Sequence, residues 1–514
     1  MPCPGFDEDD ILYAINKLKS STAAGPDGIP PILLKRCASS LWHPLQIICN
    51  KSIALGKFPE SWKLSVMFPA FKKGDKRDIK NYRGVTSLCA GSKLLETLVS
   101  RVLFFAMKNY IAQEQHGFFP GRSINTNLVE FTAFALKEME AGGQIDTIYT
   151  DLKSAFDLVN HDILLAKMKR LGAPPKFISW LESYLDSRVL SVKIGNAKSD
   201  NYQASSGVPQ GSNLGPLLFS IFFNDICFVL PDGCRLLYAD DLKIFLLIRS
   251  VEDCLELQRL ADIFQNWCSR NMLTVSTSKC CVISFSRKKT PIKWTYKISG
   301  IELERVSVVK DLGVLLDSKL SFSDHYSTII AKANRNLGFI FRIAAEFHDP
   351  YCLRALYVSL VRSVLESASI VWCPYTEIWS RRIEAVQKRF IRYALRFLPW
   401  NDPDNLPPYE DRCRLIALET LSNRRSLSKA TFVGKLLLNV IDSPNLLQQV
   451  RLNVPPRVLR NHDFLRLDYH RTMYGQNEPI RAMCNIFNSI INVFDFNVSI
   501  DVFKTRLRRL FVRL

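Results

Sequence analysis

Two adjacent carboxylates, Asp240 and Asp241, are the residues of this 514-residue chain best suited to chemistry. They lie in CRLLYADDLKIFLLI, between two apolar runs that are typical of strands. Buried charges are costly unless they are paired or hold a metal, so the tip of a hairpin is the expected place for both acids. A third acid, Asp151, ends another strand-like run, DTIYTD. Two strands that each end in acid could hold two Mg²⁺ ions about 3.5–4 Å apart, which can activate a 3′-hydroxyl and stabilise a leaving pyrophosphate. The alternative is a pair of ordinary surface turn acids.

The charge balance indicates a polyanionic partner. Lys and Arg number 68 and Asp and Glu number 49, which gives a formal net charge of +19. Residues 331–514 hold 28 of the basic and 16 of the acidic residues, so this shorter part of the chain is the more basic one. Basic residues cluster at 381–396, at 504–513 and at 287–297, where Trp294 and Tyr296 are interleaved with them. Phosphates and unstacked bases bind such mixtures, although solvated helix faces give the same pattern.

The remaining composition is that of a folded, water-soluble protein. Apolar residues make up 47% and charged residues 23% of the chain, which argues against a disordered chain, a collagen-like fibre or a multi-span membrane protein. No apolar run reaches the ~20 residues of a membrane-spanning helix. No secretory signal is visible, and the 14 cysteines include no CxxC pair, so we expect free thiols and no zinc site. The protein is therefore expected to be intracellular, in the nucleus, the cytoplasm or both, and not secreted.

Hydrophobic periodicity predicts an alternation of helices and strands. Helices are expected over 9–19, 32–55, 93–107, up to about residue 139, over 251–270 and through most of 323–396. Strands are expected near 146–150, 189–206, 235–248, 280–286 and 306–317. The basic stretch 57–84 is expected to be rich in loops. The proline-rich segment 398–411 is the best domain boundary, and the helical remainder is broken at Pro455-Pro456.

A series of motifs in a fixed order carries more information than any one of them. In order, they are NYRG (81–84), QHGFFPGRS (115–123), TDLKSAFDLVNHDILL (150–165), SSGVPQGSNLGPLLF (205–219), YADD (238–241), a segment from Trp267 to Lys279, and DLGVLLD (311–317). From about residue 9 to the end, the chain resembles the reverse transcriptases of non-LTR (LINE-type) retrotransposons, and most closely the jockey-like group. The resemblance implies an α/β (α+β) right-hand polymerase. Its expected parts are an N-terminal extension and fingers (1–143), a palm with the catalytic site (144–320), a thumb (321–400) and a basic helical C-terminal domain (401–514).

The same resemblance implies roles for individual residues. It places Asp151 and Asp240 on both metal ions with Asp241 beside them, and makes Lys279 a general acid for the pyrophosphate. Phe156 would be the steric gate against a ribose 2′-hydroxyl. The dNTP pocket would be completed by the loop and fingers residues Pro209, Gln210, Gly211, Lys72, Lys73, Arg83 and Arg122. The nucleic acid would be bound by the primer-grip residues Leu312 and Gly313 and by the thumb residues Lys388, Arg389 and Arg392. From local pattern alone, these positions could equally be a core Phe, a plain turn and solvated basic side chains.

Some positions depart from the family pattern. Gly84 stands where a proline usually follows NYR, Ser276 and Cys280 replace a frequent asparagine and threonine, and Asp311 stands where an aromatic residue is common. None of these positions is an expected metal ligand. The resemblance also predicts an upstream endonuclease domain, which is absent from this sequence.

Together these features predict an RNA-directed DNA polymerase that extends a primer 3′-hydroxyl with deoxynucleotides. Its expected cofactors are two Mg²⁺ ions, with Mn²⁺ as a substitute. Its expected partners are an RNA template, a DNA primer, dNTPs and an element-encoded RNA-binding protein, and no membrane. Phe156 argues against an RNA-directed RNA polymerase, and the tail pattern argues against an intron-encoded maturase. The alternative from another class is a non-catalytic, element-derived RNA-binding protein.

Overall fold

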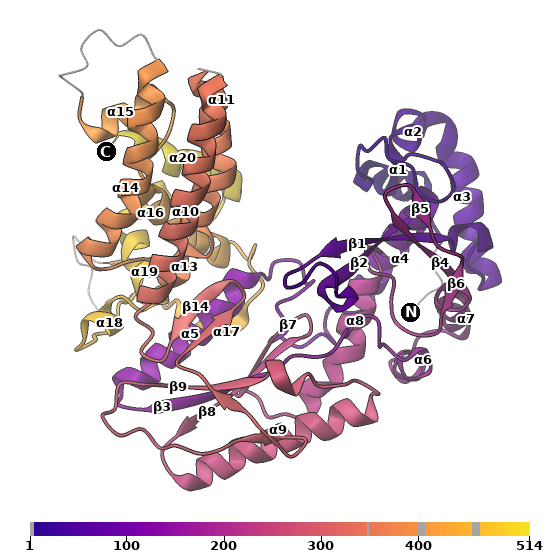
Figure 1. Ribbon diagram of the computed structural model, residues 1–514, viewed down its shortest axis with the longest axis horizontal. Helices are drawn as coiled ribbons and strands as arrows, with labels where there is room; N and C mark the ends of the chain where they lie inside the picture. Colours follow the sequence, from indigo (N-terminus) through magenta and orange to yellow (C-terminus); the bar gives the residue numbers. More distant parts are fainter. Residues whose placement is uncertain (1–4, 347–348, 398–406, 455–462, 514) are drawn as a thin grey trace.

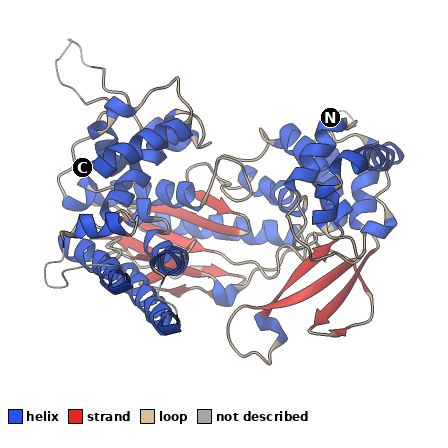
Figure 2. Ribbon diagram, turned by 90° about the horizontal axis from the view of Figure 1, so that it is seen from above, coloured by secondary structure: helices blue, strands red, loops and turns tan. Residues whose placement is uncertain are grey.

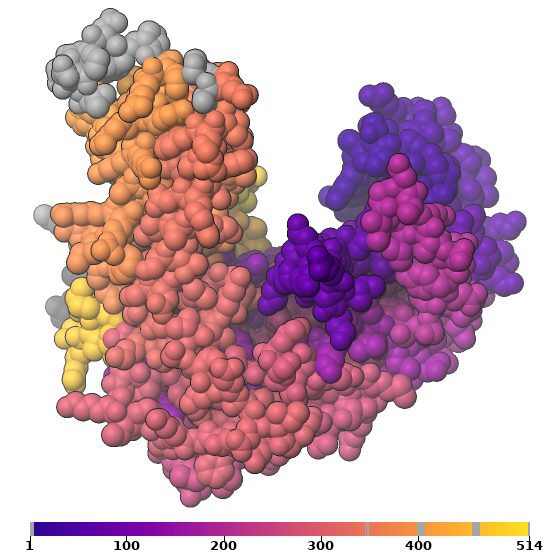
Figure 3. All heavy atoms as spheres, viewed as in Figure 1, coloured from indigo at the N-terminus to yellow at the C-terminus, as the bar shows by residue number. Residues whose placement is uncertain are grey.

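The computed structural model of the chain describes residues 5–346, 349–397, 407–454 and 463–513. It is a mixed α/β structure, as predicted. A base formed around a five-stranded sheet carries an arm of N-terminal elements on one side and an arm of C-terminal helices on the other (Figure 1). The space between the two arms is an open hollow on the molecular surface (Figure 3). The strands gather in two separate groups, one in the base and one in the N-terminal arm (Figure 2).

The sheet of the base has the strand order β12-β9-β3-β8-β7, with β3 antiparallel to both of its neighbours. The side chains of β8 alternate between two hydrophobic cores, as the period of a strand requires. Leu242 and Ile244 face the core that contains α8 and α9, whereas Phe245 faces the core that contains α5. The elements of the base are α5 (Ile124–Glu140), β3 (Gln144–Tyr149), α8 (Gly215–Phe223), β7 (Arg235–Tyr238), β8 (Asp241–Ile248), α9 (Val251–Arg270), β9 (Cys281–Ser286) and β12 (Glu304–Arg305), with the hairpins β10 (Lys297–Ile298)–β11 (Ile301–Glu302) and β13 (Val308–Asp311)–β14 (Val314–Asp317).

The N-terminal arm contains the clearest difference from the sequence prediction. The stretch 57–84 was expected to be loop-rich, but Ser65–Phe71 and the residues from Tyr82 form a long antiparallel hairpin. Pro69 and Gly84 pair with each other inside it. The buried positions of the hairpin include Ser65 and Thr86, whereas the apolar Phe68 and Val85 are exposed, so apolar residues do not mark its buried face. The elements of this arm are α1 (Glu8–Lys17), α2 (Pro31–Arg36), α3 (Ala38–Leu55), β1 (Ser65–Phe71), β2 (Tyr82–Leu88), α4 (Ala90–Met107), α6 (His161–Arg170), α7 (Pro175–Leu185), β4 (Arg188–Ile194), β5 (Ala197–Lys198) and β6 (Tyr202–Ala204).

The helix predicted over 32–55 is interrupted at Cys37, where α2 ends and α3 begins. The predicted helix over 251–270 and the predicted YADD hairpin are confirmed. β1 also pairs with β4 in a parallel arrangement, which fixes the hairpin to the segment that precedes the GVPQGS motif.

The C-terminal arm is helical, as predicted. Phe390 on α14, Phe432 on α16 and Phe503 on α20 belong to one hydrophobic core, which also includes side chains of α5. The predicted boundary at 398–411 lies largely outside the described residues, as does the break at 455–456. The helices of this arm are α10 (Ser323–Ile343), α11 (Pro350–Tyr357), α12 (Ser363–Glu366), α13 (Ser369–Trp372), α14 (Glu377–Ala394), α15 (Tyr409–Leu415), α16 (Leu421–Leu437), α17 (Pro444–Gln449), α18 (Met473–Gln476), α19 (Pro479–Ser489) and α20 (Ile500–Arg513). Among the described residues, no helix has both the length and the apolar character needed to cross a membrane.

Candidate active site

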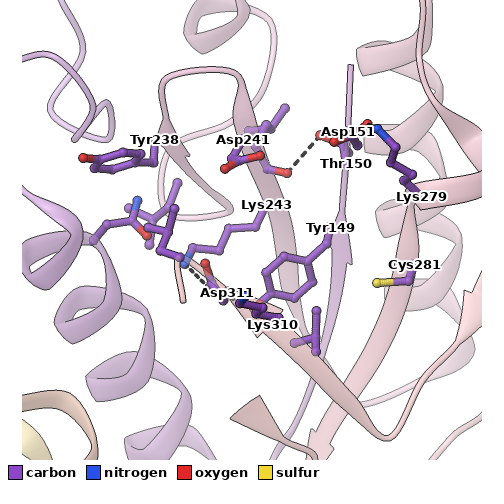
Figure 4. A pocket seen from close by; sticks show the side chains of 15 residues that line it. Tyr149, Thr150, Asp151, Tyr238, Asp241, Lys243, Lys279, Cys281, Lys310 and Asp311 are labelled. Atoms are coloured by element: carbon purple, nitrogen blue, oxygen red, sulfur yellow. Dashed lines mark hydrogen bonds and ion pairs between the residues drawn. The ribbon is translucent and has the colours of Figure 1, made fainter. Parts of the chain in front are cut away.

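Three carboxylates predicted from the sequence meet at the end of the central sheet. β7 and β8 pair as a hairpin in which Tyr238 faces Asp241, so Asp240 lies at its tip. The amide of Thr150 donates a hydrogen bond of 3.0 Å to the carbonyl of Leu242. This bond continues the pairing of β3 with β8 and brings Asp151 next to Asp241 (Figure 4).

Two of the three acids, Asp240 and Asp241, have raised pKa values. Burial among protein atoms, followed by the charges of Asp240 and Asp151, raises the pKa of Asp241 to about 6, although its side chain reaches solvent. Burial also raises the pKa of Asp240, with a further increase from Asp151 and an opposing effect of Arg83 and Lys279. The site therefore holds more negative charge than its own cations balance, which is the situation that a bound cation relieves.

A lysine side chain of the protein lies next to these acids. The Nζ of Lys279 lies 2.9 Å from Oδ2 of Asp151 and forms an ion pair that is largely exposed. The segment before Lys279 is fixed to the same acid, since the amide of Ser276 donates to the carbonyl of Asp151 at 2.7 Å. The structure thus brings together Lys279 and Asp151, which are 128 residues apart in the sequence.

Lys243, Asp311 and Tyr149 form a buried network that sequence reasoning missed. The Nζ of Lys243 lies 2.5 Å from Oδ2 of Asp311, and the hydroxyl of Tyr149 donates to the same oxygen at 3.1 Å (Figure 4). Burial lowers the pKa of Lys243, and Asp311 opposes that effect. Asp311 is one of the four residues that depart from the family pattern, and a lysine on the strand after YADD was the available signal for its partner.

The Lys243–Asp311 pair fixes a turn that was predicted to contact the primer. Asp311 ends β13, and the next two residues, Leu312 and Gly313, form the β13–β14 turn with φ angles of 43° and 94°. Leu312 lines a cavity of about 170 Å³ together with Asp151, Asp241 and Lys279. The structure therefore brings this predicted turn to the same cavity as the predicted catalytic residues.

Gln115 was also missed, and it holds the turn that carries the acids. Its side-chain amide donates to the carbonyl of Ala239 at 3.1 Å, and its Oε1 accepts from the amide of Ala239 at 2.9 Å. Ala239 has a φ of 58°, in the left-handed region that residues other than glycine rarely adopt. The side chain of Gln115 is buried, and a buried glutamine needs partners, but nothing in QHGFFPGRS itself shows that this residue is buried.

The predicted gate residue Phe156 lies against the GVPQGS loop. Phe156 is half-buried and stacks on Phe219 with ring centroids 4.3 Å apart, while Phe118 meets its edge at 5.9 Å. The amide of Val208, next to Pro209, donates to the carbonyl of Phe156 at 2.8 Å. Phe118 is exposed and has a φ of 56°, so a strained aromatic residue that the sequence did not single out borders Phe156.

The predicted triphosphate residue Arg83 is joined to this loop. Its Nε donates to Oε1 of Gln210 at 3.4 Å, and the side-chain amide of Gln210 donates to Oδ1 of Asp157 at 2.7 Å. Gly211 has a φ of 104°, and a Cβ at this position would lie 2.7 Å from the carbonyl oxygen of Thr86 on β2. Only glycine fits such a close approach, so the loop packs directly against the β1–β2 hairpin.

Other predicted residues lie away from the acids. Lys72 and Lys73 are exposed in the turn after β1. The guanidinium of Arg122 is occupied: it donates to the carbonyls of Ala112 and Gln115 and pairs with Asp442 at 3.2 Å, so its geometry is that of a packing residue. The residues predicted to belong to a thumb are all exposed on α14 of the C-terminal arm: Lys388, Arg389 and Arg392.

Carboxylate oxygens are the ligands that Mg²⁺ prefers, and Asp151, Asp240 and Asp241 supply such oxygens next to one another. In the part of the chain that the structure describes, no three or more His, Cys, Asp or Glu side chains are arranged to hold one ion. The three neighbouring carboxylates thus fit divalent cations in their donor chemistry and charge. In this conformation, however, their side chains do not form a closed metal site.

Comparison with known proteins agrees with this geometry. Residues 71–313 match the protein family described as "Reverse transcriptase (RNA-dependent DNA polymerase)". These residues are a reverse transcriptase domain. The domain includes the three acids, Gln115, Lys279 and Asp311, and it ends at Gly313 in the β13–β14 turn.

The relatives of the reverse transcriptase domain come from non-LTR retrotransposons, as the motifs predicted. The chain is 28% identical over 414 residues to the probable RNA-directed DNA polymerase from transposon BS of Drosophila melanogaster. The aligned region covers 76% of this chain and 45% of that protein. It is 28% identical over 340 residues to the RNA-directed DNA polymerase from mobile element jockey of the same species, covering 64% and 37%. It is 29% identical over 339 residues to the probable RNA-directed DNA polymerase from transposon X-element, again covering 64% and 37%. The chain thus spans less than half the length of each of these relatives.

Proposed function

We propose that this chain is an RNA-directed DNA polymerase that adds deoxynucleotides to a primer 3′-hydroxyl on an RNA template. The observation that carries the proposal is the meeting of Asp151, Asp240 and Asp241 within the reverse transcriptase domain. Burial and the neighbouring carboxylates raise the pKa values of Asp240 and Asp241. Two divalent cations bound there would supply activation of the hydroxyl and neutralisation of the leaving pyrophosphate.

The chain's own residues would position the reactants around these acids. Lys279 would leave its ion pair with Asp151 and hold a proton at Nζ for the pyrophosphate. Arg83 would contact the triphosphate from the β1–β2 hairpin, supported by its hydrogen bond to Gln210. Phe156 would exclude a ribose 2′-hydroxyl, and the Leu312-Gly313 turn would contact the primer end.

We further propose a division of the chain into functional parts. Residues 1–143 would be an N-terminal extension and fingers, 144–320 a palm, 321–400 a thumb and 401–514 a basic C-terminal domain. The hollow between the two arms would hold the template–primer duplex (Figure 3). Exposed cations on α14, namely Lys388, Arg389 and Arg392, would contact its backbone.

The test is primer extension by the full chain on an RNA template with a DNA primer, dNTPs and Mg²⁺. The matched control is the Asp240→Asn/Asp241→Asn variant, which keeps side-chain size and removes the charges. We expect the native chain to extend the primer and the variant to extend it at a rate lower by a factor of at least about 10³. The reason is that metal-dependent charge stabilisation supplies most of the acceleration in such sites. Equal extension by both proteins would refute the assignment of the acids. No extension by a folded native chain that binds the duplex would refute the proposed activity.

A further inference from the structure

A second hollow lies away from the three acids, in the C-terminal arm. It has a volume of about 580 Å³ and is enclosed by the start of α5, by α13, by α16 and by α20. Figure 1 shows α16 and α20 together in the helical arm on the same side of the base as α5. The polar side chains that line it include Ser123, Asn125, Thr431, Lys435, Lys504 and Arg508. We call this hollow the basic groove.

Close packing of two helices brings the cations of the basic groove together. Gly434 on α16 has no side chain, and a Cβ there would lie 2.4 Å from the ring of Phe503 on α20. The ring of Phe503 is fully buried against this glycine. Because Lys435 and Lys504 follow these two residues, the contact sets both ammonium groups on the groove.

The charges of the groove are not balanced. None of its lining residues is acidic, while five are basic. Three of the five are paired with acids outside the lining: Lys504 with the exposed Asp501 at 3.0 Å, Arg122 with Asp442 at 3.2 Å, and Arg424 with Glu366 and Glu419. Lys435 and Arg508 form no ion pair with any described residue.

The electrostatics of Lys435 point the same way. Burial, followed by the like charge of Lys504, lowers its pKa, and the carboxylate of Asp501 opposes that effect. One exposed carboxylate thus acts on both ammonium groups, so a further anion that enters the groove is still attracted by their combined charge. Hydroxyl groups of Ser428 and Thr431 line the groove as well, and hydroxyls donate hydrogen bonds to phosphate oxygens.

The basic groove is joined to the turn that carries Asp240. Gly121 lines the groove, and its carbonyl accepts from the amide of Asp442 at 3.2 Å. The neighbouring Arg122 donates to the carbonyl of Gln115 at 2.9 Å, and the side chain of Gln115 holds Ala239. One short loop therefore connects the groove wall to the catalytic turn.

We propose that the basic groove binds the phosphodiester backbone of a single-stranded polynucleotide, separately from the primer–template duplex at the three acids. The groove has the charge and the hydroxyl lining for backbone phosphates, and four of its five basic side chains come from the more basic part of the chain, 331–514. RNA and DNA strands present the same phosphodiester chemistry, so the experiment distinguishes them. The proposal concerns binding and does not depend on catalysis.

The experiment measures binding of fluorescent single-stranded RNA and of the DNA of the same sequence to the full chain, by anisotropy at several salt concentrations. The test variant is Lys435→Gln/Arg508→Gln. The control variant is Lys169→Gln/Arg170→Gln, which removes the same two charges from the exposed end of α6. All proteins carry Asp240→Asn/Asp241→Asn, so that binding at the active site stays constant and its loss is not confused with failure of the proposed activity.

Loss of two phosphate contacts reduces the magnitude of the slope of the logarithm of the association constant against the logarithm of the salt concentration by about 1.4. It also weakens binding roughly tenfold at about 0.15 M salt. We expect these changes in the test variant and no change in the control. A loss for RNA alone assigns the groove to RNA, a loss for DNA alone assigns it to a DNA strand, and equal losses assign it to either strand by its phosphates. The charge-conserving variant Lys435→Arg/Arg508→Lys should restore binding. Equal affinities and equal slopes for the test and control variants with both oligonucleotides would overturn the proposal.

Discussion

Replacing Gln115 by alanine should impair catalysis without any change in the three acids. The substitution removes both hydrogen bonds to Ala239, at 2.9 and 3.1 Å, and leaves a buried amide and a buried carbonyl without their partner. An unsatisfied buried group costs about 1–3 kcal/mol. The left-handed conformation of Ala239 costs about 1–2 kcal/mol more, and Gln115 helps to hold it. We therefore expect the correctly positioned turn to lose about 2 kcal/mol, which corresponds to a roughly 30-fold decrease in kcat for primer extension.

Gln144→Ala is the matched control for this prediction. Gln144 is equally buried and also takes part in three hydrogen bonds, but its partners are Asp146 and Ile292, at the opposite end of β3 from Asp151. Both variants should lower the midpoint of denaturant unfolding to a similar extent, and only Gln115→Ala should lower kcat by more than twofold. If kcat of Gln115→Ala stays within twofold of the native value, or if the two variants lose kcat equally, the argument that Gln115 positions the catalytic turn is refuted.

Three further outcomes follow from the structure. Asp311→Leu leaves the ammonium of Lys243 buried without its partner and should lower the free energy of unfolding by about 3–5 kcal/mol, whereas Lys243→Met/Asp311→Leu should recover most of that loss; equal destabilisation by both variants in urea titrations would contradict a buried ion pair. Burial lowers the pKa of His325 to about 4 from an ordinary value near 6.5, so the unfolded chain takes up its proton first, and stability should fall by about 3 kcal/mol between pH 6.5 and 4. That loss should be absent from His325→Asn, and parallel pH profiles for the two proteins would contradict it. Phe156→Ala should admit ribonucleotides while dNTP incorporation continues, and an unchanged preference between the two sugars in competition assays would exclude Phe156 as the gate.

The sequence predicted the elements of the site better than the contacts between them. The two apolar runs on either side of Asp240 and Asp241 identified a hairpin, because the acids interrupt the apolar sequence at one point. The hairpin at 65–88 was not predicted, because its buried positions include Ser65 and Thr86 whereas the apolar Phe68 and Val85 are exposed. Local pattern thus sufficed where apolar residues mark the buried positions of a strand, and it failed where they do not.

Partners that are distant in the sequence were beyond such reasoning. Lys243 and Asp311 are 68 residues apart, and Gln115 and Ala239 are 124 residues apart. For the polar side chains of Lys243, Asp311 and Gln115, the need for a partner arises only once the fold has buried them. A buried polar side chain has to be paired, but the sequence does not say with what.

The position of Arg122 shows how this affects the interpretation of a motif. As part of QHGFFPGRS it was expected to support the nucleotide pocket, yet its guanidinium binds the carbonyls of Ala112 and Gln115 and the carboxylate of Asp442. It therefore joins the loop that holds Ala239 to the segment between α16 and α17. A strand bound in the basic groove would contact the same loop from the other side. Any effect of that strand on polymerisation should pass through Gln115, so Gln115→Ala should abolish the effect while leaving the affinity for the strand unchanged.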